Sequence, residues 1–128
     1  MKSKIIAVDF DGTCVKHRYP YVGEDIGAAP ILKKLVENGH KIILLTMRDS
    51  GTVLRDALGW FRKNEIPLYA VNQNPSQNSW SDSRKVFAHY YLDDQGVGVP
   101  VIWEEDGKGY YVDWNAVDKW FKERGLYS

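Results

Sequence analysis

Six polar residues stand beside short apolar segments of this chain, where they could do chemistry together. They are Asp9, Asp11, Thr46, Lys85, Asp93 and Asp94. Taken singly, such acids often cap helices or form turns. Taken together, four carboxylates repel one another unless a cation neutralises them. Ligands that are all oxygen favour magnesium over zinc, so the combination points to a magnesium-assisted reaction.

The elements that would position these residues follow an alternating pattern. Short apolar segments rich in β-branched residues predict strands, and longer segments of helical periodicity predict helices. The predicted strands are 5–8, 41–45, 68–71, 90–92 and 99–103, and the predicted helices are 28–38, 52–63, 113–124 and a short one within 81–88. This alternation predicts the α/β class, as a Rossmann-like three-layer sandwich with a central parallel sheet of about five strands.

A parallel sheet of this kind also predicts where a ligand binds. The site lies off the carboxyl ends of the strands, where the strand order reverses. Asp9 and Asp11 follow the first predicted strand, Thr46 follows the second, and the Asp93-Asp94 pair follows the fourth. We therefore expect these side chains to meet at one edge of the sheet.

The order of these residues resembles the four motifs of the haloacid-dehalogenase superfamily. The matching residues are Asp9-Phe10-Asp11-Gly12-Thr13, Thr46, Lys85 and Asp93-Asp94, and the likeness covers about residues 4–102. Members of this superfamily share a Rossmann-like parallel sheet, and most are magnesium-dependent phosphohydrolases. The stretches 46–48, 71–75 and 91–94 further resemble a group of small stand-alone hydrolase-like proteins of bacteria and phages.

The resemblance implies a catalytic role for four of the matched residues. Asp9 would be the nucleophile that forms an aspartyl-phosphate, and Asp11 would protonate the leaving oxygen and then deprotonate the attacking water. Thr46 would donate its hydroxyl to a phosphoryl oxygen, and Lys85 would neutralise the transferring group. A halide leaving group needs no proton donor, so an aspartate at position 11 favours phosphoryl transfer over dehalogenation.

The same resemblance implies a magnesium site. The ligands would be the carboxylate of Asp9, the backbone carbonyl of Asp11 and the carboxylate of Asp93, with water and phosphate completing the coordination. Asp94 would orient these ligands without touching the metal itself, although the sequence leaves open which member of the Asp93-Asp94 pair is the direct ligand.

The substrate would reach this site without a cap domain. The two places where relatives carry a cap, 14–27 and 73–84, are far shorter than a domain, so residues 15–22, which we call the flap, would be the only lid. An open site suits a bulky phosphorylated substrate, such as a nucleotide, a nucleic-acid end or a phosphoprotein. It also suits a homo-oligomer in which a neighbouring copy supplies the lid. The predicted substrate is a phosphorylated small molecule or a nucleotide.

Three further residues are candidates for substrate binding. Gly12 allows the backbone to turn sharply beside the nucleophile. Arg48 is either a substrate contact or a partner in an ion pair at the sheet edge. Trp80 either stacks on a planar group such as a nucleobase or packs its loop onto the sheet.

Composition excludes several other classes of protein. The 128 residues predict a single domain, 1–128, and 17 basic residues against 17 acidic ones argue against bulk nucleic-acid binding. The single cysteine, Cys14, excludes a disulfide framework, and Pro20 stands where a thiol phosphatase would need an arginine. No apolar run approaches the roughly 20 residues of a membrane span, and no signal peptide is evident. We therefore expect a cytoplasmic protein with no membrane association.

Two alternatives to a phosphatase come from other classes. A phospho-receiver signalling domain has a similar length and sheet, but its phosphorylated aspartate follows the third strand, where this chain has Asn72-Gln73-Asn74-Pro75. A non-catalytic phosphate-binding protein on the hydrolase scaffold would need none of the catalytic acids, which are all present here.

Overall fold

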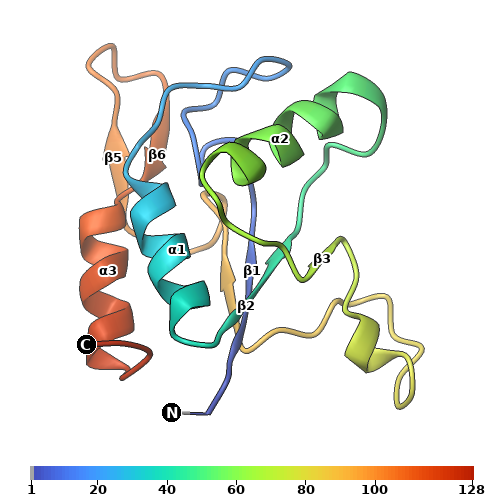
Figure 1. The fold of residues 1–128 in the computed structure, drawn as a ribbon. Helices are drawn as coiled ribbons and strands as arrows, with labels where there is room; N and C mark the ends of the chain where they lie inside the picture. Colours follow the sequence, from blue (N-terminus) through green and yellow to red (C-terminus); the bar gives the residue numbers. More distant parts are fainter. Residues whose placement is uncertain (1) are drawn as a thin grey trace.

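The central sheet has four parallel strands in the spatial order β3-β2-β1-β4 (Figure 1). The computed structural model describes residues 2–128, and these strands are β1 (Ile5–Val8), β2 (Lys41–Leu44), β3 (Ala70–Val71) and β4 (Tyr90–Leu92). The strand order reverses beside β1, because β2 and β3 lie on one side of it and β4 on the other. The predicted α/β class and parallel sheet are confirmed, with four strands instead of about five.

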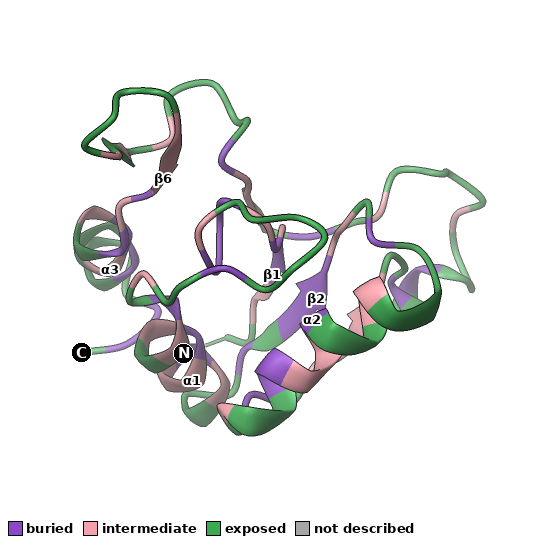
Figure 2. Cartoon of the chain, turned by 90° about the horizontal axis from the view of Figure 1, so that it is seen from above, coloured by how far each residue is buried: buried purple, intermediate pink, exposed green. Residues whose placement is uncertain are grey.

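Three α-helices pack against one face of this sheet. They are α1 (Ala28–Glu37), α2 (Gly51–Lys63) and α3 (Trp114–Glu123). Successive side chains of a strand point to opposite faces, and the residues of β1 and β2 that join the helices in the main core are Ile6, Val8, Ile42 and Leu44. Figure 2 shows α1 and α2 along the same side of the buried strands. Within residues 2–128, no helix is long and apolar enough to cross a membrane.

The other face of the sheet is covered by the irregular segment 72–89, which contains one turn of 3-10 helix, η1 (Pro75–Gln77). The short helix predicted within 81–88 is wrong. The amide of Gln77 donates to the carbonyl of Lys85 at 2.9 Å and accepts from the N–H of Phe87 at 2.8 Å. Because this side chain bonds backbone groups that a helix would have paired internally, the segment stays irregular.

The predicted fifth strand forms a separate hairpin. β5 (Val101–Trp103) pairs antiparallel with β6 (Tyr110–Val112), which the sequence analysis did not predict. The turn between them contains Asp106-Gly107, where Asp106 accepts the N–H of Lys108 and Gly107 has a φ of 71°. An Asp-Gly pair between apolar segments is a hairpin signal, so the sequence did carry the information that places β5 outside the central sheet.

Aromatic packing on the helical face holds the end of β1 in place. Phe10, the second residue after β1, is fully buried, and its ring centroid lies 5.8 Å from that of Trp60 and 6.0 Å from that of Phe61 on α2. The two α2 rings meet edge to face at 4.9 Å. This cluster fixes the direction in which the chain leaves β1, and therefore where Asp9 and Asp11 lie.

We expect Phe61→Ala to lower the free energy of unfolding by about 3–5 kcal/mol, because it leaves a cavity beneath Phe10. Chemical denaturation of the metal-free protein measures this change. Lys63→Ala, an exposed change on the same helix, should stay within about 0.5 kcal/mol of the wild type. Equal losses in the two variants would contradict the central position given to this ring.

Candidate active site

The loop after β1 is shaped by close packing rather than by its acids alone. The N–H groups of Thr13 and Cys14 donate to the carbonyl of Phe10 at 3.1 and 2.8 Å. Gly12 has a φ of +82°, and a Cβ at this position would lie 2.4 Å from Oδ2 of Asp94. Only glycine permits both this backbone conformation and this approach. Gly12 therefore lets β1 and β4 bring their acids together.

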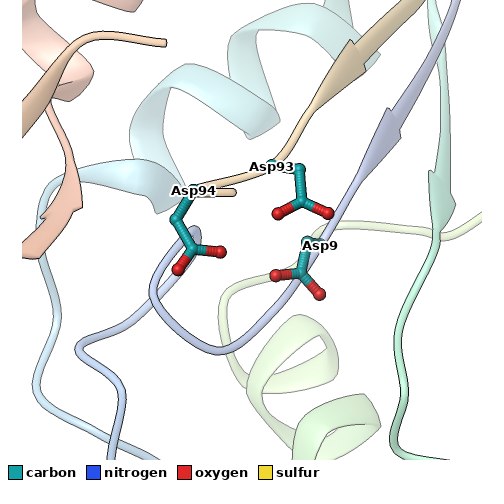
Figure 3. Close-up of side chains that lie close together, drawn as sticks. All are labelled: Asp9, Asp93 and Asp94. Carbon is teal, nitrogen blue, oxygen red and sulfur yellow. The ribbon is translucent and has the colours of Figure 1, made fainter. Parts of the chain in front are cut away.

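Three carboxylates from two strand ends form the centre of the site (Figure 3). Asp9 follows β1, Asp93 and Asp94 follow β4, and each offers an oxygen within 4.8 Å of the others. This is the switch point of the sheet, the point at which the strand order reverses, so these three residues lie together at the edge of the sheet where the sequence analysis expected them. The carboxylate of Asp11 is not part of the cluster. Its predicted contribution to a metal was through the backbone carbonyl.

Hydrogen bonds order two of the three acids. The hydroxyl of Thr13 accepts the N–H of Asp94 at 2.9 Å and lies 3.2 Å from Oδ1 of Asp94 and 3.4 Å from Oδ2 of Asp9. The side chain of Gln95 lies 3.4 Å from Oδ2 of Asp94. Asp94 is thus buried, and both of its carboxylate oxygens have a partner. Asp93 has a partner for one oxygen, which accepts the N–H of Gln95. This difference favours Asp93 as the direct ligand and Asp94 as its neighbour that orients the loop.

The electrostatics of the cluster fit a divalent cation. Burial, followed by the charge of Asp93 and a hydrogen bond with Asp94, raises the pKa of Asp9 from 3.8 to about 8. Burial also raises the pKa of Asp93. Carboxylates that resist ionisation when alone gain most from a cation, because the cation removes their mutual repulsion. The donor set of oxygens alone suits a hard ion such as Mg²⁺.

Arg48 occupies the other half of this edge. Its guanidinium donates to both carboxylate oxygens of Asp11, at 2.8 and 2.9 Å. The side chain is 1% exposed, so the predicted ion pair at the sheet edge is present. All of its N–H groups have acceptors within the protein, which leaves none for a substrate in this arrangement.

Thr46 is held at the end of β2 by the side chain of a neighbouring strand. The amide of Asn72, after β3, accepts the N–H of Thr46 at 2.8 Å and donates to its carbonyl at 3.0 Å, so it continues the sheet by one pairing. The hydroxyl oxygen of Thr46 accepts the N–H of Arg48 at 3.1 Å. The hydroxyl proton remains free to bond to an oxygen in the cleft.

A cleft of about 560 Å³ opens above these groups. Its lining residues are Asp9, Asp11, His17, Tyr19, Thr46, Met47, Arg48, Asp93, Asp94 and Gln95. The sequence analysis did not assign Tyr19, Met47 or Gln95. Met47 and Gln95 stand directly after matched motif residues, and this adjacency was the only signal available for them.

Besides Gly12, which shapes the loop after β1, two predicted site residues do not line the cleft. The ammonium of Lys85 lies 5.5 Å from the ring centroid of Tyr91, and Lys85 does not line the cleft. Trp80 is 62% exposed, donates to the carbonyl of Ser76 at 2.9 Å and meets the ring of Phe87 at 5.9 Å. Both belong to the irregular segment 72–89, whose path the sequence did not predict.

Cys14 is the remaining nucleophilic group near the site. It is fully buried, and its thiol donates to the carbonyl of Asp9 at 3.3 Å. Burial, with the charges of Asp9 and Asp11, raises the pKa of this thiol well above its ordinary value. A buried thiol of raised pKa is a poor nucleophile, which leaves the carboxylates as the candidate nucleophiles at this edge.

Comparison with known proteins finds one close match in sequence and fold. A solved structure from Bacteroides thetaiotaomicron, described as that of a conserved protein, is 35% identical to this chain. The match covers 99% of both chains with a TM-score of 0.78. A scan against models of protein families gives no match, and neither does a search of curated proteins.

The pKa of Asp9 predicts how stability depends on pH when no metal is bound. Between about pH 4 and pH 8 the folded protein keeps a proton on Asp9 that the unfolded chain has lost, so the free energy of unfolding falls as pH rises. Asp9→Asn removes this dependence. The melting temperature in chelator should therefore rise more at about pH 8 than at about pH 5.

The control for this measurement is Asp49→Asn, which makes the same change at an exposed position. It should shift the melting temperature equally at the two pH values. An equal shift for Asp9→Asn would mean that burial and Asp93 do not raise the pKa of Asp9.

Proposed function

We propose that this chain, which belongs to one family with the conserved Bacteroides thetaiotaomicron protein, is a magnesium-dependent phosphohydrolase of the haloacid-dehalogenase type. Its substrate would be a phosphorylated small molecule or a nucleotide. The observation that carries the proposal is the meeting of Asp9, Asp93 and Asp94 within 4.8 Å at the switch point of the sheet. The same proposal includes a Rossmann-like three-layer architecture, in which the sheet lies between the helices on one face and the segment 72–89 on the other.

Asp9 and Asp11 divide the chemistry between them. A carboxylate oxygen of Asp9 attacks phosphorus, the phosphorus–oxygen bond of the ester breaks, and Asp11 gives a proton to the departing alcohol. A water then attacks the aspartyl-phosphate, Asp11 takes its proton, and phosphate leaves as the carboxylate of Asp9 is restored. Both side chains line the same cleft, which supports this division.

The carboxylates of Asp9 and Asp93 would hold the Mg²⁺, with Asp94 behind them. Bound there, the ion would stabilise the negative charge that develops on the phosphoryl oxygens. The hydroxyl of Thr46, with its proton free, would donate to one of those oxygens. Lys85 does not line the cleft, so the proposal does not rely on it.

One observation favours a second candidate, a phosphate-binding protein that does not turn substrate over. Both oxygens of Asp11 are engaged by Arg48, and a carboxylate in this state cannot donate a proton. The receiver-domain alternative has less support, since β3 leads into Asn72 and the described end of that strand carries no acid. Turnover separates the two remaining candidates.

We expect hydrolysis of 4-nitrophenyl phosphate to require Mg²⁺ and to fall at least about a thousandfold in Asp9→Asn, because the amide cannot attack phosphorus. The rate of 4-nitrophenol release measures this, with protein purified free of contaminating phosphatase. Asp49→Asn should retain the wild-type rate. Binding of Mg²⁺ and phosphate without turnover in the wild type would instead support the second candidate.

The cleft also predicts which aromatic ring contacts a nucleotide. Tyr19 is 54% exposed and lines the cleft, whereas Trp80 lies outside it. If a nucleoside monophosphate is a substrate, Tyr19→Ala should raise its KM by about 5- to 100-fold, the range expected for losing a stacked base. Trp80→Ala should leave the KM within about twofold. The reverse pattern would restore Trp80 as the stacking residue.

A further inference from the structure

The guanidinium of Arg48 uses its full set of donors inside the protein. Besides its two bonds to Asp11, it donates to the backbone carbonyls of Pro20, Tyr21 and Val53, at 3.3, 2.9 and 2.7 Å. An arginine has five N–H donors in a rigid planar fork, and all five are engaged here. The group is therefore held in one orientation.

These bonds join three different parts of the chain to the end of β2. Asp11 belongs to the motif loop after β1, Pro20 and Tyr21 belong to the flap, and Val53 lies in α2. The guanidinium also lies 5.2 Å from the ring centroid of Tyr19, the flap residue that lines the cleft. If the flap leaves, two buried N–H groups of Arg48 lose their acceptors, and the guanidinium that also holds Asp11 must find new partners.

We propose that Arg48 is a positioning residue that couples the flap to Asp11, so that the position of the flap sets the position of the acid–base carboxylate. This inference rests on the proposed phosphohydrolase function. Asp11 is held by Arg48 while the flap lies as it does here. A shift of the flap over a substrate redistributes the bonds of Arg48 and frees Asp11 to exchange a proton with the leaving oxygen.

The test replaces the planar guanidinium of Arg48 and keeps its positive charge. Lysine presents three donors on a compact head, so Arg48→Lys cannot make all four of the bonds that Arg48 makes to Asp11 and the flap. We expect its kcat to fall about a hundredfold, the usual contribution of a general acid, on phenyl phosphate and on an alkyl phosphate. On 4-nitrophenyl phosphate, whose leaving group needs little protonation, the loss should be several-fold, and KM should change little throughout.

A double-mutant cycle shows whether Arg48 acts through Asp11. In an Asp11→Asn background, Arg48→Lys should cause little further loss on phenyl phosphate, because the group it positions is already gone. Arg55→Lys, a matched change at an exposed position in α2, should behave as the wild type. Equal losses on all three substrates, or a full additional loss in the Asp11→Asn background, would overturn the proposal.

Hydrogen exchange tests the coupling without relying on activity. The N–H groups of Lys16 and Tyr21 are bonded at the flap, to the carbonyls of Glu24 and Arg18. Their exchange should speed up at least about tenfold in Arg48→Lys and in Asp11→Asn, while the amides of β1 and β2 stay protected. Asp11→Asn decides the matter where Arg48→Lys fails to fold.

Unchanged flap exchange in a folded variant would overturn the coupling. A wild-type protein that hydrolyses none of the three phosphate esters would overturn the proposed function instead, and exchange at the flap would still report whether Arg48 ties the flap to Asp11.

Discussion

Repulsion between like charges is the constraint on which the carboxyl edge of this sheet depends. Three carboxylates with oxygens within 4.8 Å resist full ionisation when no cation is present. Burial, with the charge of Asp93 added to it, raises the pKa of Asp9 to about 8. A fourth carboxylate in the same cluster would increase the repulsion. Asp11 is instead paired with Arg48. The three clustered carboxylates can therefore attract a cation, while the charge of Asp11 is neutralised by the guanidinium of the protein itself.

Local signals predicted the elements that build this edge, and long-range packing decided the rest. Continuous apolar segments predicted β1 and β2, and periodic apolar stripes predicted α1, α2 and α3. The residues that follow β1 and β4 lie together, as expected for the carboxyl ends of neighbouring parallel strands. The segment 72–89 could not be predicted, because side-chain amides pair its backbone. The positions of Lys85 and Trp80 depended on that path, and neither residue lines the cleft.

Side chains that stand in for backbone partners explain why one face of the sheet differs from the other. Asn72 extends the β2–β3 pairing to Thr46, while Asn74 and Gln77 bond the backbone near Phe87. Two crossovers in the same direction, from β1 to β2 and on to β3, place α1 and α2 on one face. The return to β4 must cross the opposite face, and a few amide side chains hold it there where a helix would have had a full ladder of bonds. Such a segment opens locally at lower cost than the helical face.

The flap is fastened at two places of unequal strength. On its outer side, Lys16 and Arg18 pair with Glu104 just after β5, at 3.7 and 2.7 Å. Exposed ion pairs of this kind contribute little to stability, because water and salt screen them. On its inner side, the buried fork of Arg48 bonds two flap carbonyls, and a buried donor left without its acceptor costs about 1–3 kcal/mol. The outer fastening therefore yields first. It borders a second polar cleft of about 390 Å³ that shares His17, Asp94 and Gln95 with the first. Opening on that side exposes the cleft while the contact with Asp11 remains, so access and proton transfer are governed by different bonds.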